Sequence, residues 1–174
     1  MMSIRISKTL EKYKLWFFIG IPIIIVGILL DMAIKDLAFW VFEVKQREPF
    51  ELLKGILRFT YTENRGAAFS MLIGQRWLFV VLTVLALAFA VFAIVKEYVK
   101  GWFGVASLSL VLSGAIGNFI DRLIYGYVID MFEPVFIDFA IFNVADIFLT
   151  VGGVCLAVYL LFFSAPEKRE EIRE

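Results

Sequence analysis

Long apolar runs separated by short polar stretches dominate this chain. A helix that crosses a bilayer needs about 20 mostly apolar residues, and four runs meet that length. The predicted spans cover residues 15–34, 77–95, 101–122 and 139–163. We therefore expect a mainly α-helical membrane protein, built as a single integral membrane unit over residues 1–174.

The first apolar run follows four basic residues, as the start of a secretory signal does. These are Arg5, Lys8, Lys12 and Lys14. The run is longer than the 7–15 apolar residues typical of a signal, and no small-residue cleavage site closes it. We interpret it as an uncleaved first span.

The connection between the first two spans, about residues 40–75, predicts structure of its own. Apolar and polar residues alternate over 57–62, which is the pattern of a half-buried strand. Residues 63–66 are typical of a turn, and residues 50–53 are a candidate partner strand. We expect a small β-sheet on the outer membrane face.

Composition narrows the possible chemistry. The chain is 61% hydrophobic, against about 45–50% in soluble domains. Its net charge of zero gives no support for nucleic-acid binding. Because the chain has no histidine, Ser-His and Cys-His pairs and the HExxH zinc helix are excluded. Cys155 is expected to be a buried apolar residue. A hydrolase would have to use Asp or Glu, with Lys as a weaker candidate.

The basic residues predict the orientation of the chain. The connection after the second span carries Lys96 and Lys100, and the amino-terminal segment is basic. Positive charge favours the cytoplasmic side, so we expect both termini in the cytoplasm. The first outer connection fits less well, because it also contains basic residues, among them Lys45, Lys54, Arg58, Arg65 and Arg76.

With this topology, the polar groups within the spans all approach the outer face. The groups are Asp31 and Lys35 in the first span, Asn118, Asp121 and Arg122 in the third, and Asn143 and Asp146 in the fourth. Polar groups in a bilayer are costly and mark functional sites by default. Counted from the start of its span, Asp146 should lie about 7–12 Å below the membrane end of the helix.

The spacing of these groups leaves some alternatives open. Asp31 and Lys35 are four residues apart in the order that favours a structural ion pair. The cluster around Asn118 could equally serve as polar contacts between helices. Asp130 lies in a predicted short loop with Glu133 and Asp138, and spacing does not choose among these acids. Five small residues predict close packing of the third and fourth spans: Ser113, Gly114, Gly117, Gly152 and Gly153.

Two facing aspartates would provide a complete hydrolytic site. They cannot both ionise cheaply, so they share a proton and titrate as a pair. The charged member activates a water, and the protonated member serves as the acid for the scissile carbonyl and the leaving amine. Such a pair suits hydrolysis of a peptide bond close to lipid.

Five motifs, in order, resemble those of the prolipoprotein signal peptidases (signal peptidase II, an aspartic peptidase family). They are Asp31 with Lys35, the stretch 64–69 (Asn-Arg-Gly-Ala-Ala-Phe), the stretch 117–122, the stretch 128–130 (Val-Ile-Asp), and the stretch 142–146 (Phe-Asn-Val-Ala-Asp). The resemblance extends from about Asp31 to Gly153. One departure is Met131, where family members commonly have Phe, and we expect little effect from it.

The resemblance implies both a reaction and a set of site residues. The catalytic dyad falls on Asp130 and Asp146. Substrate-binding or supporting roles fall on Asn64, Asn118, Asp121, Arg122 and Asn143. The implied reaction removes the signal peptide of a bacterial prolipoprotein just before a diacylglyceryl-modified cysteine. It takes place at the outer face of the cytoplasmic (inner) membrane, without metal or cofactor, and is blocked by globomycin.

Two other functions also place acids within membrane spans. Such acids can mark ion or proton pathways, but the second and third spans carry no charge below their outer ends. A membrane scaffold would use the aspartates only as contacts between helices. That role gives no reason for a submerged Asp146 or for Asp130.

Overall fold

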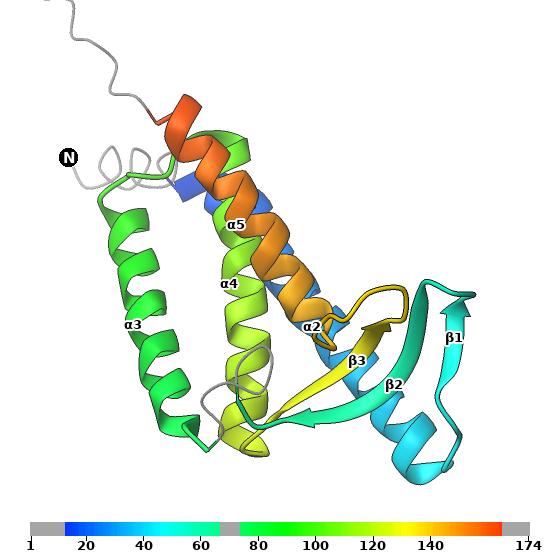
Figure 1. Ribbon diagram of the computed structural model, residues 1–174. Coiled ribbons are helices and arrows are strands. Elements are labelled where there is room, and N and C mark those ends of the chain that lie inside the picture. Colours follow the sequence, from blue (N-terminus) through cyan, green and yellow to red (C-terminus); the bar gives the residue numbers. More distant parts are fainter. Residues whose placement is uncertain (1–12, 67–73, 165–174) are drawn as a thin grey trace, which may run out of the picture.

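The part of the chain that the structure describes forms four long helices and a three-stranded sheet (Figure 1). The computed structural model describes residues 13–66 and 74–164. The helices are α2 (Ile21–Phe39), α3 (Arg76–Val95), α4 (Gly101–Ile124) and α5 (Val144–Phe162). Each lies within a helical segment long and apolar enough to cross a membrane. The predicted fold class, mainly helical with a small sheet, is confirmed.

Two predicted spans begin or end elsewhere in the structure. Short π-helical turns, η1 (Trp16–Gly20) and η2 (Trp40–Val44), flank α2 and extend the first helical segment over Tyr13–Val44. The polar residues beyond position 30 do not end it. At the other end of the chain, α5 starts at Val144 rather than at residue 139, because residues 139–142 are not helical and Asn143 caps the helix.

Helix α4 lies at the centre of the bundle. Half of its most apolar stretch is buried, compared with about a fifth of the corresponding stretch in each of the other three helical segments. Large apolar side chains therefore cover the outer surfaces of α2, α3 and α5. That arrangement is expected for helices surrounded by lipid, where apolar side chains face outward without cost.

Glycines bring α4 and α5 into close contact. A Cβ at Gly114 would overlap the carbonyl oxygen of Ala145, and one at Gly152 would lie 2.8 Å from the backbone nitrogen of Val111. Gly153 differs from the prediction, because a Cβ there would meet nothing within 4 Å. Ser113 also differs, since it packs against Gly27 of α2.

The two adjacent glycines of α5 offer a matched test of this packing. Gly152→Ala is expected to lower the free energy of unfolding by about 1–3 kcal/mol through overpacking. Gly153→Ala should be neutral, or stabilising by up to about 1 kcal/mol, because Ala favours the helix. Thermal unfolding in detergent measures both changes, and equal midpoints for the two variants would contradict this packing.

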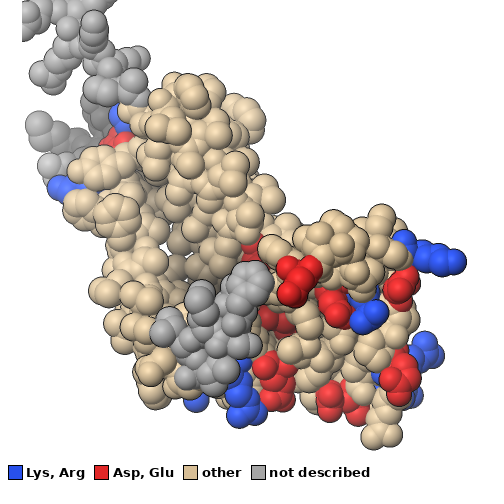
Figure 2. Space-filling view, viewed as in Figure 1, with Lys and Arg blue, Asp and Glu red and all other residues tan. Residues whose placement is uncertain are grey.

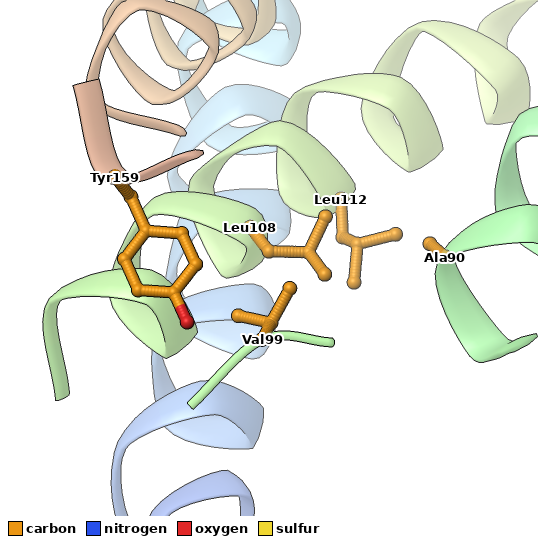
Figure 3. Close-up of a cluster of buried hydrophobic side chains, with 5 residues drawn as sticks. All are labelled: Ala90, Val99, Leu108, Leu112 and Tyr159. Atoms are coloured by element: carbon orange, nitrogen blue, oxygen red, sulfur yellow. The ribbon is translucent and has the colours of Figure 1, made fainter. Parts of the chain in front are cut away.

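A buried apolar cluster joins the helices at the end of the bundle away from the sheet (Figure 3). It consists of Ala90, Val99, Leu108, Leu112 and Tyr159. The Tyr159 hydroxyl accepts a 2.8 Å hydrogen bond from the backbone nitrogen of Lys100. This bond ties the connection between α3 and α4 to α5.

The sheet lies across the other end of the bundle, in the order β1 (Phe50–Leu53), β2 (Leu57–Asn64) and β3 (Val128–Pro134), all antiparallel. Strand β3 was not predicted, and Asp130 lies on it opposite Thr62 rather than in a loop. The first four residues of β3 are all buried, so the strand lacks the alternation that marks a half-buried one. Charged side chains gather over this end of the molecule, while the helical body carries few (Figure 2).

Candidate active site

A cavity of about 550 Å³ opens where β2 and β3 meet the ends of α4 and α5. Its polar lining comes from β2, α4, β3 and α5, which are far apart in sequence. The polar residues are Asn64, Asn118, Arg122, Asp130 and Asp146. Its apolar lining comes mainly from residues 139–142 and from Ile147, Leu149 and Val151 of α5. The cavity therefore combines a polar end containing two carboxylates with an apolar wall.

Asp130 is buried at the polar end of the cavity, with 2% of its surface exposed. Its Oδ2 accepts a 2.9 Å bond from Asn64 Nδ2, and its Oδ1 accepts a 2.7 Å bond from Asn143 Nδ2. Burial and the negative charge of Asp146 raise the pKa of Asp130 to about 7, against the lowering effect of these bonds. Asp130 therefore retains its proton well above the usual range of an aspartate.

Asp146 lies in the first turn of α5. It forms a capping box with Asn143, in which each side chain accepts a bond from the other's backbone nitrogen. Its Oδ1 also accepts a 2.8 Å bond from Asn118 Nδ2. The predicted depth of 7–12 Å is wrong, because α5 starts five residues late and leaves Asp146 only about 3 Å along the helix axis.

The fully buried Asn143 side chain connects the two aspartates. Its Nδ2 faces Asp130 Oδ1, Asn118 Oδ1 at 3.0 Å and the carbonyl oxygen of Ile129 at 3.3 Å. Its Oδ1 accepts a 2.9 Å bond from the backbone nitrogen of Asp146. One amide side chain thus orients the acid on β3 and caps the helix that carries the other.

Behind the cavity, the predicted Asp31–Lys35 pair is present, with 2.7 Å between Asp31 Oδ2 and Lys35 Nζ. It belongs to a larger buried network. Lys35 Nζ also lies 2.9 Å from Asp121 Oδ2 and donates a 3.2 Å bond to Asn118 Oδ1. The polar residues of α2 and α4 that sequence spacing placed in separate groups therefore form one cluster.

Arg122 lies at the rim of the cavity and connects three segments. Its guanidinium donates 3.3 Å bonds to the carbonyl oxygens of Asn118 and Gly66, and it lies 4.7 Å from the ring centre of Phe79 in α3. Sequence spacing gave no sign of the contacts with Gly66 and Phe79. They place a positive charge beside the carboxylates and join α3 to the site.

Of the three acids that spacing left open, Asp130 lines the cavity. Glu133 pairs with Arg58 across the sheet at 3.1 Å, and Asp138 is exposed. The wall formed by residues 139–142 was missed, because its apolar composition is the same as that of the fourth span. Among the described residues, no three Asp, Glu or Cys side chains are grouped so that they could hold a metal ion.

The four apolar helices of the described residues, with two carboxylates that line one cavity, define a multi-pass membrane protein with a candidate hydrolytic site. The chain belongs to the signal peptidase (SPase) II family, whose model matches residues 10–162. Membership places it among the membrane signal peptidases that process prolipoproteins. The resemblance indicated by the motifs is thereby confirmed.

Individual relatives agree with this membership. The chain is 46% identical over 144 residues to a lipoprotein signal peptidase of Streptococcus thermophilus (strain CNRZ 1066), an alignment that covers 82% of this chain and 92% of that one. It is 41% identical to one of Lactococcus lactis subsp. cremoris (strain MG1363), with 82% and 93% covered. A solved bacterial membrane enzyme at 2.3 Å resolution is 30% identical with a TM-score of 0.75, covering 88% of this chain and 94% of that one.

Proposed function

We propose that the chain is an intramembrane aspartic endopeptidase that uses Asp130 and Asp146 as its catalytic dyad. It cuts the prolipoprotein just before the diacylglyceryl-modified cysteine. The observation that carries this proposal is the shared cavity: both carboxylates line it, and Asn143 bonds to the side chain of one and the backbone of the other.

The two carboxylates are suited to different tasks. Asp130, with its pKa raised to about 7, holds the proton and donates a hydrogen bond to the scissile carbonyl. Asp146 takes a proton from a water held between the two side chains, and that water attacks the carbonyl carbon. Asp130 then protonates the leaving amine, and the proton on Asp146 returns the pair to its starting state.

The remaining polar lining supports the dyad and the substrate. Asn64 and Asn143 hold the two oxygens of Asp130, and Asn118 holds Asp146. Arg122 offers a charged donor to the substrate backbone at the rim. Asp121 supports the dyad from behind the cavity, where it accepts a bond from the backbone nitrogen of Ile129, next to Asp130. The apolar wall along α5, where Val151 is 47% exposed, is suited to a lipid-bearing substrate.

The proposed orientation places the dyad at the outer face of the cytoplasmic (inner) membrane. The sheet lies at one end of the bundle, and the connection between α3 and α4 lies at the other, together with the end of α5 (Figure 1). That connection carries Lys96 and Lys100. Positive charge favours the cytoplasmic side, so both termini are cytoplasmic. Inhibition by globomycin, implied by the family resemblance, stays a prediction.

The substrate proposal is tested by cleavage of one precursor in two forms. Purified protein in detergent is given the same prolipoprotein with and without the diacylglyceryl group on its cysteine, and the products are identified by mass spectrometry. We expect a cut directly before the modified cysteine and at least about 100-fold slower cleavage of the unmodified form. Equal rates, or a cut at another bond, would refute the proposed specificity.

The raised pKa of Asp130 predicts the alkaline limit of activity. Turnover needs Asp130 protonated and Asp146 ionised, so kcat/KM should fall about tenfold per pH unit above about 7 as Asp130 loses its proton. The stability of the fold should also fall with rising pH. Because the native pKa of Asp130 exceeds its ordinary value of 3.8, the contribution of Asp130 to the free energy of unfolding declines as pH rises from about 4 to 7. A rate that stays flat to pH 9, measured on folded protein, would contradict the assignment of the proton to Asp130.

A further inference from the structure

The side chain of Lys35 is buried at the meeting point of α2 and α4, with 2% of its surface exposed. Its ammonium group contacts Asp31 Oδ2 at 2.7 Å, Asp121 Oδ2 at 2.9 Å and Asn118 Oδ1 at 3.2 Å. An ammonium group has three N–H donors and no acceptor. The ammonium group thus forms ion pairs with two carboxylates and donates a hydrogen bond to one amide oxygen.

Each of the two carboxylates paired with Lys35 also holds a backbone N–H group. Asp31 Oδ1 accepts a 2.9 Å bond from the nitrogen of Ala145, and Asp121 Oδ2 accepts a 3.2 Å bond from the nitrogen of Ile129. Ala145 directly precedes Asp146, and Ile129 directly precedes Asp130. The lysine is thus connected through one carboxylate to the backbone beside each member of the dyad.

The third contact of Lys35 fixes the orientation of an amide. Because the ammonium group can only donate, the Asn118 side chain must turn its oxygen toward Lys35. Its nitrogen then faces Asp146 and donates the 2.8 Å bond to Oδ1. Removal of the lysine would leave the 3.0 Å bond from Asn143 Nδ2 as the remaining contact that holds the oxygen of this amide away from the carboxylate of Asp146.

We infer that Lys35 is a positioning residue that sets the separation of the two dyad carboxyl groups, an inference that rests on the proposed function. Through Asp31 it locates the start of α5, and through Asp121 it locates strand β3. A water shared by two carboxyl groups needs both at fixed distances, and a misplacement of about 1 Å can cost about 100-fold in rate. Lys35 lies behind the cavity and is absent from its lining.

Gly117 allows this connection to be disturbed without changing any polar side chain. A Cβ at Gly117 would lie 2.5 Å from Asp31 Oδ2, so Gly117→Ala must displace the carboxylate that holds Ala145. Gly153→Ala is the matched control, because it makes the same change on a neighbouring helix and meets nothing within 4 Å.

The first experiment measures kcat and KM separately for both alanine variants with a lipidated precursor. We expect Gly117→Ala to lower kcat about 10-fold to 100-fold while KM stays within about threefold and the protein remains folded. Gly153→Ala should leave both constants unchanged. An unchanged kcat in folded Gly117→Ala, or a rise in KM that accounts for the whole loss, would overturn the inference.

A second variant removes the lysine itself. Lys35→Met combined with Asp121→Asn removes one positive and one negative charge, so the network keeps its net charge. We expect kcat to fall about 100-fold with KM retained. Tyr159→Phe, which removes a buried hydrogen bond at the opposite end of the bundle, gives the effect of a purely structural loss. A fall in kcat no larger than that of Tyr159→Phe would overturn the inference.

The two proposals fail in different ways. If wild-type protein does not cut the lipidated precursor, the proposed function fails. If wild-type protein cuts it and the Lys35 and Gly117 variants keep the wild-type kcat, only the positioning role of Lys35 fails. If the double variant does not fold, Gly117→Ala decides, because it introduces no charge and no polar group.

Discussion

Replacement of Asp146 with Asn is expected to lower the rate of prolipoprotein cleavage by about 1,000-fold or more while the protein remains folded. The amide keeps the size of the carboxyl group, and its oxygen can still accept the bond from Asn118. It cannot take a proton from water, so the general base is lost, a change that typically costs about 10²–10⁴ in rate. Single-turnover cleavage of a diacylglyceryl-modified precursor, followed by gel or mass spectrometry, measures the loss.

The controls separate loss of chemistry from loss of structure. Asp130→Asn should lower the cleavage rate by a similar factor, because the two members of a dyad act as a unit and the effects of replacing them do not add. Asp138→Asn changes an exposed acid in the connection that follows β3 and should retain the wild-type rate. Asp138→Asn should unfold at the wild-type temperature. The two dyad variants should stay folded with lower midpoints, because an amide has one acceptor oxygen where each carboxylate accepts bonds with two. A folded Asp146→Asn protein that retains more than about a tenth of the activity would contradict the assignment of the base.

Asn143→Ala is expected to have the second largest effect, because it affects stability and turnover together. Loss of the cap of α5 should cost about 1–2 kcal/mol in the free energy of unfolding. Loss of the bonds to Asp130 and Asn118 leaves Asp130 held by Asn64 alone and removes the side-chain connection between the two. We expect kcat to fall about 100-fold or more, as measured in the same cleavage assay beside thermal unfolding.

Asn143→Ser separates the two parts of this effect. Serine is as good an N-cap as Asn, so most of the stability should return. Its single short hydroxyl cannot both cap the helix and reach Asp130, so turnover should stay low. Recovery of kcat in step with stability would show that Asn143 acts only as a cap and has no role in orienting the dyad.

The hydrophobic pattern was enough to predict the four long helices of the described residues and the presence of a small sheet. It could not predict β3, because Val128 to Met131 are all buried and show no alternation. It also could not distinguish the apolar, non-helical stretch 139–142 from the helix that follows it. The bridge between Phe132 and Phe142 holds the end of this stretch beside β3.

Spacing correctly grouped the polar residues at one end of the bundle but gave their local geometry wrongly in two places. Asp146 is close to the start of its helix rather than two turns into it, because the helix begins at its Asn143 cap. Asp130 is on a strand held by Asn64, Asn143 and, through its neighbour, Asp121. The connection of these groups through Lys35 depends on how four elements pack, which no local pattern encodes.

The source of the oxygen added to the cleaved peptide tests the central claim most directly. A single turnover with excess enzyme is run in H₂¹⁸O and quenched, and the signal peptide and the enzyme are both analysed by mass spectrometry. If Asp130 and Asp146 activate a water, the new carboxyl group of the signal peptide carries one ¹⁸O and both aspartates stay unlabelled. Label in Asp130 or Asp146, with an unlabelled peptide, would mean that the carboxylate itself attacks, and this result would contradict a dyad that activates water.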